Sequence, residues 1–538
     1  MGRKNTLTRH TAHSPVMGHT LDTHTAVTPA AKQAKEIALV DQVEAIRRLA
    51  ASALDEDQRA RMGQFMTPAP VARLMASMFE DLTGNLHLLD AGAGVGSLTA
   101  AFVEEACGRK PKPDSITVNA YELAPLLVSY LEKTQPLCRE ACRRAGVRFS
   151  AKVFAEDFIE QASYLLKGDL FAERIQPRFN RAILNPPYRK IHSESRERKL
   201  LREVGIETSN LYTAFVALAI ELLEDGGELV AITPRSFCNG PYFKPFRKLL
   251  LDTMTIKHIH IFHARNKAFK EDAVLQENII FHAVKARVTD RLIISSSTCA
   301  EDTHIMRRTA SQREVVNPND SDRVIHIATT EEEGSVALKA RSLPCSLEDL
   351  GIAVSTGRVV DFRAEAYIRE KPGKSTAPLI YPGHFEDGFI AWPKVNGRKA
   401  NALVDNQATA DLLVPSGTYV LVKRFTAKEE RRRVVAAIYD PERIRTERVG
   451  FENHLNYYHI NGDGVARNIA KGLALFLNST LVDQYFRQFS GHTQINATDL
   501  RSLRYPSIEQ LKRLGSRVRN KMPDQARIDA IIEDVLFG

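Results

Sequence analysis

The sequence predicts an α/β fold, in which a doubly wound sheet with helices on both faces precedes a mixed α+β domain. Between residues 86 and 284, short apolar runs of strand length alternate with longer runs of helical periodicity, which is typical of parallel strands joined by helices. Polar motifs follow four of the short runs, at the carboxyl ends where such sheets bind ligands. Beyond about residue 345 the apolar runs shorten and turns such as Tyr381-Pro382-Gly383 become frequent, so we expect a second domain of different architecture.

The domain organisation follows from length and composition. The 538 residues suffice for two domains and a short extra segment. Residues 1–32 are rich in Thr, His, Ala and Pro and lack periodicity, which predicts a disordered tail. We expect the doubly wound domain over residues 33–290, a polar and irregular junction over 291–345, and the second domain over 346–538.

The elements of the first domain are expected in the following order. A helix is expected within residues 33–60, where apolar residues recur at helical spacing: Ile37, Val40, Val43, Ile46 and Leu49. Four runs predict strands over 86–89, 116–121, 147–154 and 179–184, the first of them short and buried. Residues 211–223 form an apolar helix stopped by Asp225-Gly226-Gly227, and residues 228–233 form a buried strand ended by Pro234.

A glycine-rich turn joins the first predicted strand to a helix over residues 97–106. The turn reads Asp90, Ala91, Gly92, Ala93, Gly94, Val95, Gly96. Alternate glycines let the main chain turn tightly and approach a ligand closely. Such a turn taken alone fits any strand–helix corner, so the residues at the next strand ends decide how it is interpreted.

Acidic residues end the second and third strands. The carboxylate of Glu122 can accept hydrogen bonds from both hydroxyls of a ribose. Asp157 can accept from the amino group of an adenine, and Phe158 can lie on its ring. Each acid taken alone fits a surface or helix-capping residue, but in this order on successive strand ends they favour a nucleoside site.

The fourth strand ends in Asn185-Pro186-Pro187-Tyr188, which suits a planar amino group. The side-chain carbonyl of Asn185 and the main-chain carbonyl of Pro186 can accept its two hydrogens. The two prolines fix φ and stiffen the loop. Tyr188 offers a ring on which a flat substrate can lie.

These motifs together resemble the S-adenosylmethionine-dependent amino-methyltransferases, specifically the gamma (Taq-type) class of DNA adenine-N6 methyltransferases. Closer still, the chain resembles the stand-alone modification enzymes of type II restriction systems. That class has a cofactor motif before the glycine turn, matched here by residues 63–68 with Thr67 and Pro68. The resemblance covers roughly residues 60–285. It implies a Rossmann-like methyltransferase sheet, S-adenosylmethionine as cofactor, and a DNA target-recognition region in the second domain.

The resemblance also implies a mechanism, direct methyl transfer to N6 of an adenine flipped out of duplex DNA. Asn185 and the Pro186 carbonyl would hold the amino group, with Tyr188 on one face of the base. The family places a second aromatic residue before a late strand, where Phe269 is the best match and Phe262 the competitor. The tetrapeptide itself accommodates adenine N6 or cytosine N4.

Charge agrees with a polyanionic partner, duplex DNA. The net charge is +9, and residues 341–538 carry 29 Lys and Arg against 23 Asp and Glu. An ordinary basic protein would have the same balance. Side chains of the types that contact phosphates or base edges give these candidates: Arg189, Lys190, Arg358, Lys423, Arg424, His492, Gln494 and Asn496.

Three other functions were weighed. Methyltransferases of protein glutamine or of rRNA guanine N2 carry the same tetrapeptide, but the late domain, the residue 63–68 motif and Asp157-Phe158 favour DNA. The intact motifs disfavour a non-catalytic DNA-binding module. A fused endonuclease lacks room before residue 60, so a separate cognate restriction endonuclease is the expected companion.

Cysteine usage and hydropathy predict a cytoplasmic protein without metal. The six cysteines show no CxxC spacing, which favours reduced thiols over a disulfide or zinc framework. No apolar stretch reaches transmembrane length, and the first residues lack the apolar core of a signal peptide. We therefore expect no membrane partner.

Overall fold

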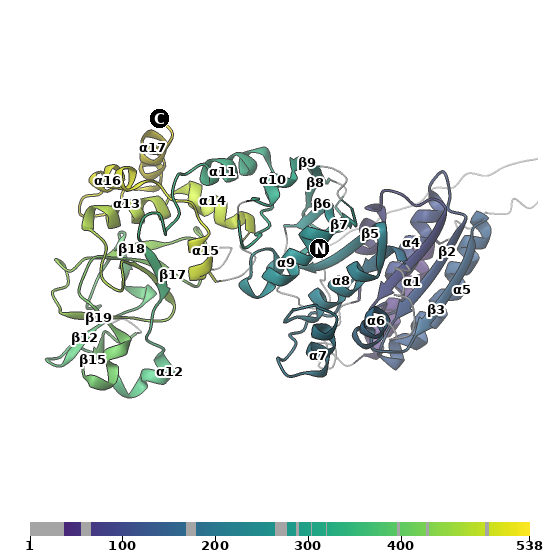
Figure 1. Ribbon diagram of the computed structural model, residues 1–538, viewed down its shortest axis with the longest axis horizontal. Coiled ribbons are helices and arrows are strands. Elements are labelled where there is room, and N and C mark those ends of the chain that lie inside the picture. The colour runs from purple at the N-terminus through teal and green to yellow at the C-terminus, as the bar shows by residue number, and fades with distance from the viewer. Residues whose placement is uncertain are drawn as a thin grey trace, which may run out of the picture. The chain divides into compact units, whose positions relative to one another are not determined.

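A nine-stranded sheet organises the first part of the chain (Figure 1). The computed structural model describes residues 37–54, 66–167, 179–263, 277–286, 290–302, 304–318, 320–394, 399–426, 430–489 and 494–538. The sheet has the order β3-β2-β1-β4-β5-β7-β6-β8-β9. Its strands are β1 Asn85–Ala91, β2 Ser115–Tyr121, β3 Arg148–Phe154, β4 Phe179–Leu184, β5 Leu223–Pro234, β6 Thr255–Phe262, β7 Asn278–Val284, β8 Arg291–Ser297 and β9 Met306–Ser311.

Strand directions are mixed. β1 to β5 run parallel to one another, whereas β7 is antiparallel to both β5 and β6, and β9 is antiparallel to β8. The α/β class and the doubly wound sheet are confirmed, but the expectation of a parallel sheet is wrong at β7. An apolar run reads the same in either direction, so hydrophobicity alone carries no information about strand direction.

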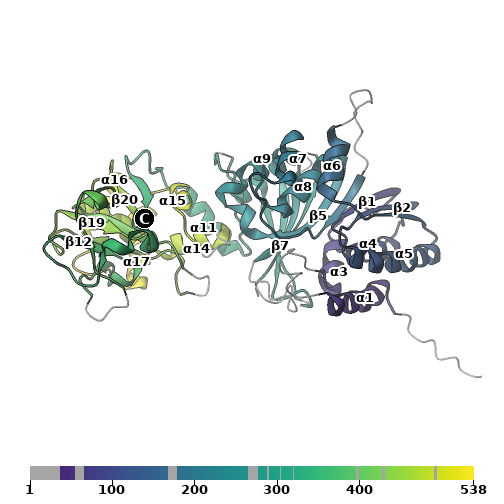
Figure 2. The same ribbon diagram turned by 90° about the horizontal axis from the view of Figure 1, so that it is seen from below.

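Helices cover both faces of this sheet, as Figure 2 shows. One face packs against α1 Leu39–Ala53, α3 Ala69–Ser77, α4 Ser97–Gly108 and α5 Pro125–Ala145. The other packs against α6 Phe158–Lys167, α7 Arg196–Glu203, α8 Leu211–Leu222 and α9 Lys244–Thr253. α8 is apolar all round and almost wholly buried, as expected of a helix enclosed on every side.

The predicted elements are confirmed with shifted ends. The expected apolar face of α1 holds at Val40 and Val43, which are buried, but Ile37 and Leu49 are more than 60% exposed. β5 begins at Leu223 rather than 228, so the two glycines lie inside the strand. In the described ranges, no helix is both long and apolar enough to cross a bilayer.

Residues 291–345 are more regular than expected. They contain β8 and β9, then α10 Gln312–Val315 and α11 Glu331–Arg341. β8 pairs with β6 and continues the large sheet. The domain boundaries drawn from composition stay predictions. The expectation that residues 291–345 are irregular is wrong. Short strands with exposed polar residues, such as β9, have little apolar signal to reveal them.

Two smaller sheets and a helical group form the remainder. The six-stranded sheet has the order β10-β20-β17-β18-β14-β13 and the five-stranded sheet β11-β15-β12-β19-β16. Their strands are β10 Ala353–Thr356, β11 Ile368–Arg369, β12 Thr376–Ile380, β13 Phe385–Glu386, β14 Phe389–Ile390, β15 Ala402–Val404, β16 Leu413–Pro415, β17 Tyr419–Lys423, β18 Ala436–Tyr439, β19 Arg448–Phe451 and β20 Leu455–His459. The helices are α12 Asp361–Ala364, α13 Arg467–Leu477, α14 Thr480–Phe489, α15 Ala497–Arg501, α16 Ile508–Ser516 and α17 Gln525–Leu536.

Candidate active site

A cavity of about 280 Å³ opens at the carboxyl ends of β1, β2 and β4. Open α/β sheets bind ligands at this edge. The structure brings together on its wall nine residues predicted from the sequence: Thr67, Gly92, Gly94, Glu122, Asp157, Phe158, Asn185, Pro187 and Arg189.

The glycine turn forms one wall. Gly92 and Gly94 have φ of +76° and +58°, a region that residues with a Cβ rarely adopt. A Cβ on Gly92 would also lie 3.6 Å from the ring of Phe215. The main chain therefore approaches the cavity in a way that requires glycine at this position.

Glu122 holds this turn in place from the end of β2. One carboxylate oxygen accepts from the N–H of Gly94 at 2.9 Å and the other from the N–H of Ala124 at 2.8 Å. Burial raises the pKa of Glu122. A carboxylate has about four acceptor positions, so these two bonds leave capacity for the hydroxyls of a ligand.

Asp157 and Phe158 form the wall after β3. Asp157 accepts from the main-chain N–H groups of Ile159 at 2.8 Å and Glu160 at 3.1 Å, which caps α6. The ring of Phe158 is 3% exposed and lies 5.1 Å from that of Phe215. Asp157 is thus a helix cap and a cavity residue at once.

A glycine turn, a carboxylate and an aromatic wall fit a nucleoside-bearing ligand.

Three predicted cofactor residues lie behind the wall. Asp90 is fully buried and accepts from the hydroxyl of Thr99 at 2.6 Å, and burial raises its pKa to about 7. Ala91 is fully buried, and Pro68 directly precedes α3. The part of the residue 63–68 motif before Met66 lies outside the described residues.

The catalytic tetrapeptide is tied to two other segments. The side-chain amide nitrogen of Asn185 donates to the hydroxyl of Thr67 at 3.0 Å. The hydroxyl of Tyr188 is 3.2 Å from the amide oxygen of Asn185 and 3.4 Å from the carbonyl of Ile232. Burial raises the pKa of Tyr188, which keeps the phenol protonated as a donor. These contacts orient the Asn185 amide with its nitrogen on Thr67 and its oxygen on Tyr188.

The aromatic partner of Tyr188 is not located. Phe269 lies outside the described residues, so its role stays a prediction. The competitor Phe262 is 3% exposed in the core, with its ring 4.7 Å from that of His260. Phe215 from α8, which sequence reasoning missed, does line the cavity. In the sequence, no signal distinguishes Phe215 from the core residues of this mainly apolar helix.

The basic stretch after Tyr188 is largely paired with acids. Arg189 lines the cavity and lies 3.6 Å from Glu197. Lys190 is exposed. The arginines of α7 form ion pairs with carboxylates, among them Arg196–Glu160, Arg198–Glu207 and Arg202–Glu207. This segment carries less unpaired positive charge than its composition suggests.

The predicted DNA-contacting residues of the second domain divide into two groups. Arg358 donates to the carbonyl of Asp411 at 3.2 Å, and Lys423 lies 5.6 Å from the centre of the Phe385 ring. Arg424, Gln494 and Asn496 lie close together instead, although 70 residues separate the first two in sequence: Arg424 is 3.4 Å from Gln494, and Asn496 caps α15. His492 lies outside the described residues.

Comparison with known proteins adds four similarities. The family described as Eco57I restriction-modification methylase matches residues 132–269. Type II methyltransferase M.PstI of Providencia stuartii is 50% identical over 495 residues, 92% of this chain and 96% of that protein. Type II methyltransferase M.BsuBI of Bacillus subtilis is 45% identical over 485 residues, 89% and 95% of the two chains. The type IIL restriction-modification enzyme MmeI, solved in complex with DNA, has a TM-score of 0.51 at 11% identity, covers 93% of this chain and 73% of its own, and shows a shared fold.

Proposed function

Because the chain belongs to the type II methyltransferases of restriction–modification systems, we propose that it is an adenine-specific, gamma-class member. It transfers the methyl group of S-adenosylmethionine to N6 of an adenine flipped out of duplex DNA. The observation that carries this proposal is the Asn185–Tyr188 tetrapeptide at the end of β4, of which Asn185 and Pro187 line the cavity, with the Asn185 amide held by Thr67 and Tyr188.

The cofactor of this chain is S-adenosylmethionine. The main chain at Gly92 and Gly94, the carboxylates of Glu122 and Asp157, and the ring of Phe158 would hold it. When bound, it supplies an electrophilic methyl group.

Asn185 and Pro186 act on the target amine. Their carbonyl oxygens accept its two hydrogens, which draws the nitrogen lone pair out of conjugation with the ring. Orientation and electrostatic complementarity to a nitrogen that becomes positive supply the rate enhancement. No histidine lines the cavity among the described residues, and none is needed because the methylated amine loses its proton readily. Extruding the base from the duplex costs a few kcal/mol, which DNA contacts must supply.

Adenine N6 is favoured over cytosine N4 by two features. The motifs follow the gamma order, with the cofactor motif before the glycine turn and the recognition region last. The tetrapeptide ends in the aromatic Tyr188. Methylation would protect host DNA from a separate cognate endonuclease in the cytoplasm. Membership of the type II methyltransferases argues against protein or rRNA as the substrate.

Methyl transfer from labelled S-adenosylmethionine tests the proposal. Duplex DNA, ribosomal RNA and protein extract are offered separately, and labelled DNA is digested to nucleosides. We expect label in N6-methyladenine that saturates at a fixed number of sites per DNA molecule. Label in N4-methylcytosine would contradict adenine specificity, and label confined to RNA or protein would overturn the DNA proposal.

Thr67 offers a test of how the catalytic amide is oriented. Thr67→Val removes the acceptor of the Asn185 N–H at nearly constant volume. We expect a single-turnover transfer rate about fivefold lower, since a hydrogen bond contributes about 1 kcal/mol. Thr67→Ser keeps the hydroxyl and should restore the rate. Because Thr67 also lines the cavity, cofactor Kd is measured for each variant, and a loss explained wholly by Kd would contradict an orienting role.

A further inference from the structure

Three side chains from separate segments form an exposed patch in the second domain. Phe425, just after β17, is 41% exposed. His454, between β19 and β20, is 47% exposed. Gln494, just before α15, is half-buried. We call these three residues the aromatic–amide patch.

Arg424 ties the segments of the patch together. Its carbonyl accepts from the N–H of Ile495 at 2.7 Å, and its guanidinium donates to the carbonyl of Asn453 at 3.3 Å and to the side-chain oxygen of Gln494 at 3.4 Å. The same guanidinium lies 5.7 Å from the centre of the Phe425 ring. Arg424 therefore organises the patch, and both terminal nitrogens of its guanidinium donate to protein groups.

The two polar members keep hydrogen-bonding capacity. The carboxylate of Glu452, itself buried, accepts from Nδ1 of His454, and the imidazole lies 4.6 Å from the Phe425 ring. No residue in the described parts of the chain bonds Nε2 of His454 or the amide nitrogen of Gln494. The patch thus presents one apolar ring beside two polar groups whose positions are restrained.

We propose that the aromatic–amide patch reads base edges of the target sequence in duplex DNA. Phosphates are contacted mainly by cations, whereas base edges are read by amides, imidazoles and apolar groups. The patch itself contains no Lys or Arg, and its neighbouring guanidinium is engaged with protein. Phe425 fits an apolar base surface such as a thymine methyl group, and Gln494 and His454 fit donors and acceptors on base edges. This inference rests on the proposed function, that the chain binds duplex DNA.

Contacts with the first domain hold the segment that carries Gln494. On one side of it, Arg235 donates to the carbonyl of Gln488 and pairs with the buried Glu277 at 3.0 Å. On the other side, Asn239 donates to Asp499 at 3.3 Å. Arg235 directly follows β5, the strand whose Ile232 carbonyl contacts Tyr188. The patch is therefore connected to the sheet that carries the catalytic tetrapeptide.

Phe425→Ala and His454→Ala test the patch. The methylated sequence is first mapped by sequencing DNA from cells that express the chain. Binding to a duplex containing that sequence and to a scrambled duplex is then measured over a range of salt concentrations. We expect each variant to lose about 10- to 100-fold affinity for the specific duplex, the range for one base contact. Affinity for the scrambled duplex and the dependence on salt should be unchanged, because no phosphate contact is lost.

Phe362→Ala is the matched control. Phe362 is also an exposed phenylalanine of the second domain, 76% exposed, with a neighbouring arginine, Arg363, 5.5 Å from its ring centre. The substitution Phe362→Ala should leave the affinities for the specific and the scrambled duplex unchanged. Equal losses on the two duplexes, or unchanged specificity in both patch variants, would overturn the inference. A wild-type protein that does not distinguish the two duplexes would instead contradict the proposed function, and unchanged cofactor Kd verifies that each variant is folded.

Discussion

Replacing Asn185 with alanine is expected to lower the single-turnover rate of methyl transfer by about 10²- to 10³-fold, the range for losing a group that stabilises developing charge. The amide oxygen of Asn185 is one of two acceptors proposed for the target amine, and alanine removes it without blocking the cavity. The main-chain carbonyl of Pro186 remains, but one acceptor cannot hold both hydrogens. Transfer of labelled methyl groups to saturating DNA measures the effect.

Binding measurements separate this loss from general damage. The cofactor Kd and the DNA Kd of Asn185→Ala should stay near the wild-type values, since the cofactor wall is built by other residues. Asn185→Asp is a second variant of matched size. It keeps an acceptor for the amine but cannot donate to Thr67, so we expect activity between those of alanine and asparagine. Transfer by Asn185→Ala at a rate close to wild type would contradict the catalytic assignment.

The sequence predicted the cavity wall well because ligand sites of open α/β sheets lie at strand ends. Gly92, Glu122, Asp157 and Asn185 each lie within three residues of the end of a predicted strand, and the structure brings all four to one cavity. The physical requirement, a polar group just beyond a buried strand, is local in sequence and therefore readable. Strand direction is not local, which is why β7 was predicted parallel.

Contacts between distant segments escaped prediction for the same reason. Thr67 was assigned to the cofactor, but its hydroxyl contacts Asn185, 118 residues away. Arg433 lies in a basic run typical of a solvated surface, yet it is fully buried and its main-chain N–H donates to the carboxylate of Asp483, 50 residues away. Only the folded chain shows which polar groups meet. Composition therefore overestimates the positive charge available to DNA.

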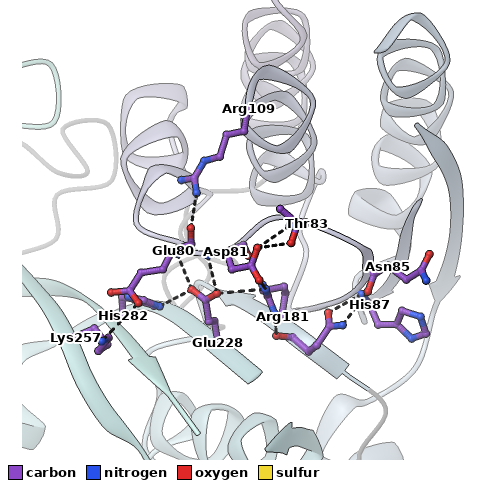
Figure 3. Close-up of polar contacts among 11 residues, drawn as sticks. Glu80, Asp81, Thr83, Asn85, His87, Arg109, Arg181, Glu228, Lys257 and His282 are labelled. Atoms are coloured by element: carbon purple, nitrogen blue, oxygen red, sulfur yellow. Dashed lines mark hydrogen bonds and ion pairs between the residues drawn. The ribbon is translucent and has the colours of Figure 1, made fainter. Parts of the chain in front are cut away.

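Glu228 is the clearest example of polar groups that meet only in the folded chain. Its buried carboxylate is the centre of a polar network (Figure 3). This network lies at the end of the parallel strands opposite the cavity. The carboxylate accepts from the main-chain N–H groups of Glu80 at 2.7 Å and Asp81 at 3.1 Å and from His282 at 2.8 Å. Arg181 lies 3.4 Å away. Burial alone would raise the pKa of Glu228, but the bond from His282 and the charge of Arg181 outweigh it and hold the pKa below its ordinary value.

Glu228→Gln should therefore lower the free energy of unfolding by about 3 kcal/mol, as expected when one member of a buried ion pair is lost. The substitution leaves the charge of Arg181 uncompensated and turns an amide N–H₂ toward the N–H donor of either Glu80 or Asp81. Urea unfolding at pH 7 measures the change. Glu80→Gln is the matched control, because Glu80 is exposed and 3.6 Å from Lys257, and such pairs contribute less than about 1 kcal/mol.

The pH dependence gives an independent check of the charge. Folding lowers the pKa of Glu228. The contribution of its charge to the free energy of unfolding is therefore fully present above the pKa of the unfolded state, about 4.3. That contribution is lost as the pH falls through the lower pKa of the folded state. The stability difference between wild type and Glu228→Gln should therefore narrow below about pH 4. A difference that stays constant into acid, or a loss no larger than that of Glu80→Gln, would show that the Glu228 charge does not hold this edge of the sheet together.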